Sequence, residues 1–171
     1  MSRDRRNPRR FGGWGLFLLA VVGALVFMMG NYAAQVPTDR LYAKNHMWGQ
    51  VGPEGLRFGF TAYAVRLLQD VYFLDWTVEP GTVLAERQEI GAIESKKAES
   101  SLYAPVAGKL LRFNEALLRD PSAINLDTYG AGWLFEIEYR GQSLLSPDGY
   151  LEHLAAVWEI TQRTIKGQMN E

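Results

Sequence analysis

The chain has 171 residues, a net charge of −1 and no cysteine. This length accommodates one domain with a hydrophobic core plus appended segments, rather than two large domains. The lack of cysteine excludes disulfides and thiolate metal sites, and two histidines poorly supply a histidine metal site or a catalytic triad. The balanced charge gives no indication of nucleic-acid binding. We therefore expect no metal site and no nucleic-acid partner. Carboxylates such as Asp70, Asp75 and Glu79 are scattered through the chain with no evident pairing, so no catalytic residues are expected and an enzyme acting alone is the least favoured class.

The N-terminus combines a basic tail with a long uncharged segment. Residues 1–10 contain five arginines, and no charged residue occurs from 11 to 36. We predict a transmembrane helix over residues 11–34, because 24 residues at about 1.5 Å each exceed a hydrocarbon core of about 30 Å. A cleaved signal peptide fits less well, since cleavage after Ala34 would place Tyr32 at the −3 position.

The arginine tail also predicts an orientation. Positive residues stay on the cytoplasmic side, so the N-terminus is expected in the cytoplasm. The following domain is then expected on the periplasmic side of a single-pass protein of the cell inner membrane. Arg9 and Arg10 could alternatively belong to a degenerate twin-arginine export signal, although setting the topology explains them more simply.

Beyond a linker at residues 35–41, short β-like runs alternate with Gly, Pro and Asp turns, which is typical of a small barrel or sandwich. A short helix is expected after Thr61 as N-cap, and another from Pro147 after Ser146. The expected strands are 41–51, 56–60, 70–76, 89–95, 101–104, 109–115 and 132–139. The expected domain is residues 42–140, followed by a C-terminal helix within 141–171.

One short motif offers chemistry. Residues 94–98 read Glu-Ser-Lys-Lys-Ala and lie between two predicted strands, so Lys96 and Lys97 are expected at the tip of a β-hairpin. Taken alone, two lysines at a turn are most simply explained by solvation of that turn.

The surrounding blocks change this interpretation. The chain resembles the H protein of the glycine cleavage system, a relative of lipoyl and biotinyl carrier domains. The resemblance implies a mainly β fold, a lipoyl-domain-like barrel-sandwich hybrid with short peripheral helices. The matching blocks are Tyr42…His46-Met47-Trp48, Gly59-Phe60-Thr61-Ala62-Tyr63-Ala64, Asp70-Val71-Tyr72-Phe73-Leu74, Glu94-Ser95-Lys96-Lys97-Ala98, Leu102-Tyr103-Ala104-Pro105-Val106-Ala107-Gly108, Asn114-Glu115-Ala116-Leu117 and Tyr129-Gly130-Ala131-Gly132-Trp133-Leu134.

The resemblance also implies a modified lysine. In that family the lipoylated lysine is the fourth residue of a Glu-Ser-x-Lys-Ala word, which here is Lys97. Glu94, three residues before, and Gly108, eleven residues after, match the family's supporting residues. Biotin carriers flank their lysine with methionines, which are absent here, so covalent lipoate on Lys97 is the expected cofactor.

The implied function is that of a carrier, and two hypotheses stay open. In the first, the lipoyl arm shuttles groups or electrons between lipoyl-dependent partner enzymes, as an H protein passes an aminomethyl group from glycine decarboxylase to an aminomethyltransferase. In the second, the scaffold is a non-catalytic accessory subunit of a membrane protein complex. The second is favoured by the predicted anchor and by two departures from the family pattern: Met47 where glutamate is usual, and Ser101 where aspartate is common.

Overall fold

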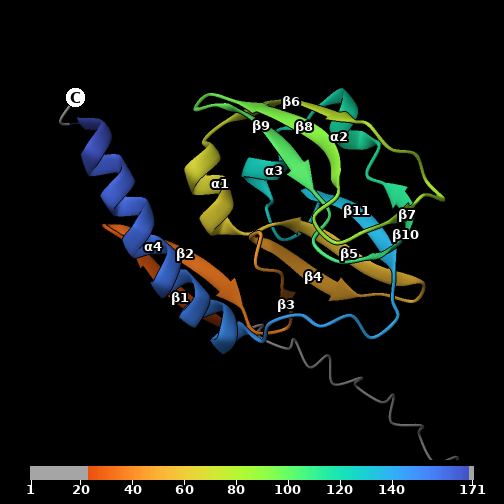
Figure 1. Ribbon diagram of the computed structural model, residues 1–171, viewed down its shortest axis with the longest axis horizontal. Coiled ribbons are helices and arrows are strands. Elements are labelled where there is room, and N and C mark those ends of the chain that lie inside the picture. The colour runs from red at the N-terminus through yellow and green to blue at the C-terminus, as the bar shows by residue number, and fades with distance from the viewer. Residues whose placement is uncertain (1–22, 170–171) are drawn as a thin grey trace, which may run out of the picture.

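Antiparallel sheets organise the residues that the computed structural model describes, 23–169 (Figure 1). In that range a six-stranded sheet has the order β3-β4-β5-β11-β10-β7, and a three-stranded sheet has the order β6-β8-β9. The strands of these two sheets are β3 (Leu41–Tyr42), β4 (Met47–Val51), β5 (Gly55–Phe60), β6 (Val71–Trp76), β7 (Val83–Leu84), β8 (Glu89–Ser95), β9 (Glu99–Tyr103), β10 (Gly108–Phe113) and β11 (Trp133–Glu138).

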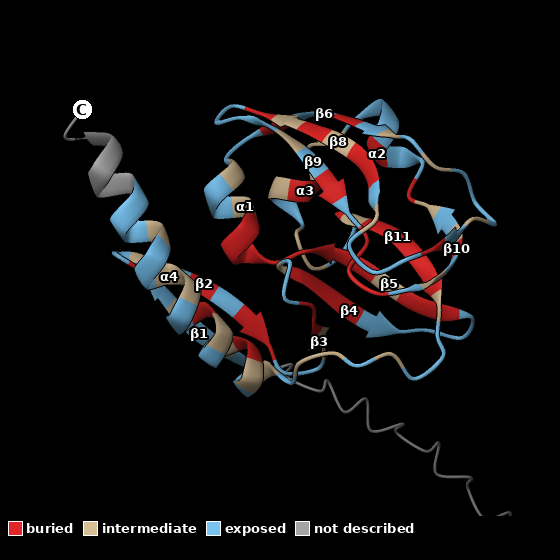
Figure 2. Cartoon of the chain, viewed as in Figure 1, coloured by how far each residue is buried: buried red, intermediate tan, exposed pale blue. Residues whose placement is uncertain are grey.

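Side chains from both sheets form the main hydrophobic core. Phe58 and Phe135 from the six-stranded sheet and Ile90, Ile93 and Leu102 from the three-stranded sheet are all buried in one cluster. Alternation along each strand directs such residues inward and their polar neighbours outward. Figure 2 shows this as buried stretches on the strands that face the interior. The predicted mainly β fold with short helices is confirmed.

The helices begin where the sequence indicates. Helix α1 (Ala62–Leu68) follows Thr61, whose hydroxyl accepts a hydrogen bond from Ala64 N at 3.3 Å. Helix α4 (Pro147–Met169) starts after Ser146, whose Oγ accepts from Gly149 N at 3.1 Å. Two helical turns that the sequence reading did not anticipate, α2 (Ala116–Arg119) and α3 (Ala123–Leu126), connect β10 to β11.

The predicted transmembrane helix over residues 11–34 is wrong within the described range. Strands β1 (Ala24–Met29) and β2 (Tyr32–Pro37) instead form a two-stranded antiparallel hairpin, so residues 35–37 continue a strand rather than a linker. Gly30, with φ of 62°, and Asn31 make the two-residue turn between them. Residues 11–22 of the prediction lie outside the described residues. Among residues 23–169, no helix is both long enough and apolar enough to span a membrane.

The hairpin packs on helices α1 and α4 and creates a second hydrophobic core. On its inner face, Met29, Ala34 and Val36 are buried. Phe27 makes edge-to-face ring contacts with Tyr63 of α1, at 6.1 Å, and with Trp158 of α4, at 6.5 Å. Figure 1 shows α4 lying along the hairpin at one side of the domain. Part of the uncharged segment, the β1–β2 hairpin, therefore packs against both α1 and α4.

Candidate functional site

The predicted carrier lysine lies on the turn between β8 and β9. Lys96 and Lys97 occupy the positions between Ser95 and Ala98, and both lysines are exposed. Strands β8 and β9 are paired as far as Glu94 and Glu99, so the two lysines lie just beyond the last paired residues of the hairpin. The three-stranded sheet that includes β6 supports this hairpin from one side.

The buried hydroxyl of Ser95 fastens the turn from within. Its Oγ lies 3.2 Å from Ala98 O and accepts bonds from the backbone N–H groups of Lys97 and Ala98, both at 3.3 Å. Ser95 N also donates to Ala98 O at 2.9 Å. From the neighbouring strand end, Asp70 O accepts from Lys96 N at 2.8 Å. The backbone of the turn is thus held in place while the lysine side chains extend into solvent.

The structure places the two supporting residues differently. Glu94 lies in the same hairpin as Lys97, half-buried and opposite Glu99, so two carboxylates stand beside the lysines on one face. Gly108 lies in the other sheet, at the start of β10, with φ of 151°. A Cβ there would come within 2.7 Å of Ile137 Cγ2, so this position needs glycine for packing between strands.

A groove that the sequence does not predict runs beside the β8–β9 hairpin. Its volume is about 210 Å³. Helix α1 forms one wall, strand β9 the other, and the turn before β4 closes one end. The lining residues are Asn45, His46, Met47, Phe60, Ala64, Leu67, Leu68, Ile93, Ser100, Ser101, Leu102 and Tyr103. Because Ser100 to Tyr103 belong to the strand that starts at the lysine turn, the groove follows that strand away from the lysines.

His46 at the end of this groove is tied to helix α4. Its Nδ1 lies 3.0 Å from the hydroxyl of Tyr150, and that hydroxyl also lies 2.9 Å from Thr61 Oγ1. Its ring stacks on His153, with centroids 5.5 Å apart. Burial lowers the pKa of His46 to about 4, and the nearby His153 acts in the same direction. His46 is therefore a neutral side chain near pH 7.

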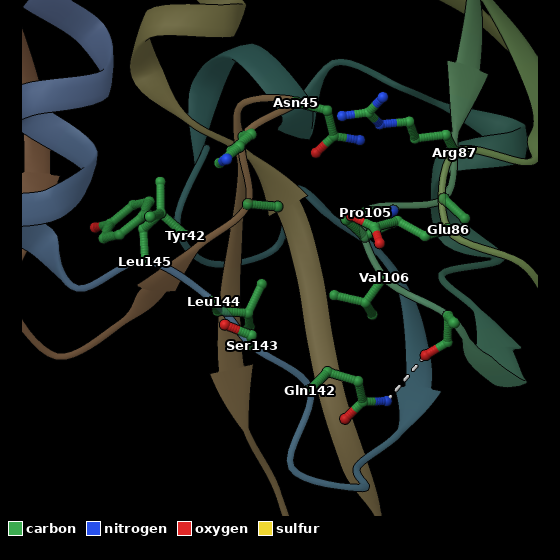
Figure 3. Close-up of a pocket in the computed structure, with 14 residues that line it drawn as sticks. Tyr42, Asn45, Glu86, Arg87, Pro105, Val106, Gln142, Ser143, Leu144 and Leu145 are labelled. Atoms are coloured by element: carbon green, nitrogen blue, oxygen red, sulfur yellow. Dashed lines mark hydrogen bonds between the residues drawn. The ribbon is translucent and has the colours of Figure 1, made fainter.

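A larger cavity of about 420 Å³ lies at the far end of β9 (Figure 3). It is lined by the turns that precede β8, β10 and α4, and Arg87 extends across it toward Asn45 in Figure 3. Gln142 Nε2 donates to Ala107 O at 3.1 Å along its lower edge. Asn45 lines both this cavity and the groove, and its Nδ2 donates a hydrogen bond to Tyr103 O at 3.1 Å.

Comparisons with known proteins agree with this geometry. A family model described as "Glycine cleavage H-protein" matches residues 40–157. The glycine cleavage system H protein of Thermus thermophilus is 37% identical over 123 residues, which are 70% of this chain and 95% of that protein. The corresponding protein of Myxococcus xanthus is 39% identical over 106 residues, covering 62% of this chain and 81% of that protein.

The fold comparison points the same way. The crystal structure of a glycine cleavage system H protein from Mycobacterium marinum superposes with a TM-score of 0.62 at 32% identity. The match covers 71% of this chain and 98% of that one. The β1–β2 hairpin, at residues 24–37, precedes the span matched by the family model.

Proposed function

The chain belongs to the glycine cleavage H-protein family, and from this we propose that it is a non-catalytic carrier with lipoate joined by an amide bond to Lys97. One observation carries the proposal: Lys97 is exposed on a turn whose backbone is held by the buried Ser95 hydroxyl. A carrier lysine must be reachable by the enzyme that modifies it and by every partner that it serves. The turn meets both needs without exposing the core.

The physical division of labour follows from this arrangement. The scaffold is rigid and the arm is mobile, so the arm raises the effective concentration of its end group near a partner's active site without tight binding. Coupling the lysine to lipoate removes its positive charge and leaves a long neutral tether. The cofactor supplies the disulfide and thiol chemistry, and the chain supplies presentation. The expected partners are lipoyl-dependent enzymes.

Two further residues support the lysine in this proposal. Glu94, together with Glu99, provides negative charge at the base of the turn, which complements a basic surface on a modifying or partner enzyme. Gly108 keeps β10 close to β11 and so supports the scaffold rather than the arm.

Mass spectrometry of the natively expressed chain tests the proposal. A lipoyl increment is expected on the peptide that contains Lys97, and Lys97→Arg should abolish it. The neighbouring Lys96→Arg provides a matched control, because it removes a lysine from the same turn and should leave the modification in place. A lipoyl increment that moves to Lys96, or a chain that is wholly unmodified in its native cell, contradicts the proposal.

The alternative is an accessory subunit that uses the same scaffold without the arm. The β1–β2 hairpin favours it, because this addition to the matched span, together with α4, offers a surface of its own for other subunits. Complementation separates the two functions: Lys97→Arg should be inactive if the chain is a carrier and fully active if it is an accessory subunit.

A further inference from the structure

The larger cavity, of about 420 Å³, is formed by segments other than the turn that carries Lys97 (Figure 3). Its volume falls within the usual range of small-molecule pockets, about 300–1,000 Å³. Four stretches that are separate in the sequence line it, at residues 42–45, 86–87, 104–107 and 142–145. The carrier function makes no use of this cavity, which is therefore a candidate for a second binding site.

The buried part of the cavity lining is apolar. Ala104, Pro105 and Val106, in the turn between β9 and β10, are all buried. Leu144 and Leu145, in the loop before α4, add two half-buried aliphatic side chains. A hydrocarbon group that enters the cavity leaves water and contacts other hydrocarbon, which favours its binding.

The exposed part of the lining carries more positive than negative charge. Lys44 and Arg87 are both exposed cations, and Glu86 is the one carboxylate among the described residues that line the cavity. Within the part of the chain that the structure describes, neither cation forms an ion pair. Figure 3 shows the side chain of Arg87 extended across the cavity toward Asn45. Both cations are therefore placed to contact a bound anion.

The backbone of Arg87 shows that the fold itself does not require an arginine there. Its φ is 65°, in the left-handed region that glycine adopts freely and that other residues rarely adopt. Its N–H donates to Ala104 O at 3.0 Å, and glycine would make the same hydrogen bond with less backbone strain. Strain of this kind is concentrated at functional sites, where a side chain is needed for what it contacts.

We propose that this cavity binds an organic monocarboxylate, with its carboxylate at Arg87 and Lys44 and its hydrocarbon body against Val106 and Leu144. The planar guanidinium presents paired N–H donors that match the two oxygens of a carboxylate, and Lys44 adds a second positive charge. Glu86 disfavours a phosphate or a dicarboxylate, because its own carboxylate repels additional negative charge. A free monocarboxylic acid and the C-terminus of a peptide both present this chemistry.

Titration of the full chain with hexanoate, followed by two-dimensional amide NMR, tests the proposal. Hexanamide has the same shape without the charge and is the matched neutral probe. We expect hexanoate to shift the amides of Ala104, Val106 and Leu144 with a dissociation constant on the order of 1 mM. Hexanamide should bind at least about tenfold more weakly. Equal affinity for the two probes, or the absence of a saturable shift at these amides with hexanoate, overturns the proposal.

Substitutions at Arg87 separate binding from folding. Arg87→Gln removes the charge and should weaken hexanoate binding at least about tenfold, whereas Arg119→Gln, at an exposed arginine on α2 outside the cavity, should leave it unchanged. Arg87→Gly relieves the positive φ, so it should lose hexanoate binding while its thermal unfolding midpoint stays the same or rises. Unchanged hexanoate affinity in both Arg87 variants overturns the proposal.

An N-acetylated peptide that ends in leucine distinguishes the two sources of the carboxylate. Tighter binding of this peptide than of hexanoate assigns the cavity to a protein C-terminus, and the reverse order assigns it to a free acid. Equal binding of the peptide and its C-terminal amide shows that the carboxylate is not recognised and overturns the proposal. Lys97→Arg should bind hexanoate as the wild type does, so the outcome is independent of whether Lys97 carries lipoate.

Discussion

His46 should make the stability of the protein depend on pH between 7 and 5. Its ring is half-buried, bonded to Tyr150 and stacked on His153, and burial lowers its pKa from 6.5 to about 4. Unfolding releases this ring into water, where its pKa returns to about 6.5. Below pH 6.5 the unfolded chain therefore binds a proton that the folded chain does not. Stability is complete above pH 6.5 and is lost as the pH falls toward 4.

The magnitude follows from these two pKa values. At pH 5 the His46 ring is almost wholly protonated in the unfolded chain and about a tenth protonated in the folded chain. The free energy of unfolding is therefore lower by about 2 kcal/mol at pH 5 than at pH 7. The loss grows further toward pH 4, where carboxylates also titrate and obscure it. The window from pH 7 to pH 5 is therefore the informative one.

Urea unfolding at pH 7, 6 and 5 measures this loss, with His46→Asn as the reference. Asparagine tolerates the positive φ of 67° at this position and does not titrate. The wild type should lose about 2 kcal/mol more than the variant between pH 7 and pH 5. If the unfolding free energies of the two proteins fall in parallel over this range, His46 is not held neutral by burial and the reasoning is refuted.

Three further predictions concern other contacts. Tyr150→Phe removes the hydroxyl that bonds Thr61 in a buried cluster, so it should lower the unfolding free energy by about 2 kcal/mol in urea titration; an unchanged midpoint would contradict this. Ser95→Ala should cost about 1 kcal/mol and speed amide exchange at Lys97, since the turn loses its internal acceptor; equal exchange rates would show that the turn is rigid without it. Phe27→Ala removes a half-buried ring that lies between two helices, so it should lower the unfolding free energy by about 2 kcal/mol and raise amide exchange in α4. Unaltered exchange in α4 would argue that the ring of Phe27 does not hold this helix in place.

The sequence specified the domain well because its signals were local. Thr61 and the Ser146-Pro147 pair begin helices through hydrogen bonds and backbone preferences that involve neighbouring residues only. The turn at Lys96 and Lys97 likewise lies between two runs that alternate. Such features can be recognised without knowing what the chain packs against.

The hairpin at residues 24–37 was missed for a physical reason. Both of its faces are apolar: Leu25 and Phe27 point inward, whereas Val26 and Met28 are 46% and 52% exposed. The contrast of period two that marks a strand is therefore absent, and a uniformly apolar run favours a helix prediction. The Gly30-Asn31 pair was the one available signal, since Gly-Asn between apolar runs is typical of a two-residue hairpin turn.

The groove could not be derived from the sequence because it exists only between elements. Helix α1 and strand β9 are far apart along the chain, and α1 packs against the hairpin and α4 through contacts that are also distant in sequence. His46 and its partner Tyr150 lie more than a hundred residues apart in the sequence. Pairings of this kind follow from the three-dimensional packing rather than from any motif.

The position of the base of the β1–β2 hairpin determines where a surface or a fusion partner can be joined to the domain. Thr38 closes that base by donating N and Oγ1 hydrogen bonds to Gly23 O, at 2.9 and 2.8 Å. In Figure 1 this base lies beside β3, at the opposite end of the view from the β8–β9 turn. Whatever precedes residue 23, natural or engineered, therefore joins the domain at the pole opposite the lysine. A surface or fusion partner joined there would not obstruct an arm attached to Lys97, and enzymes could still approach that end of the domain.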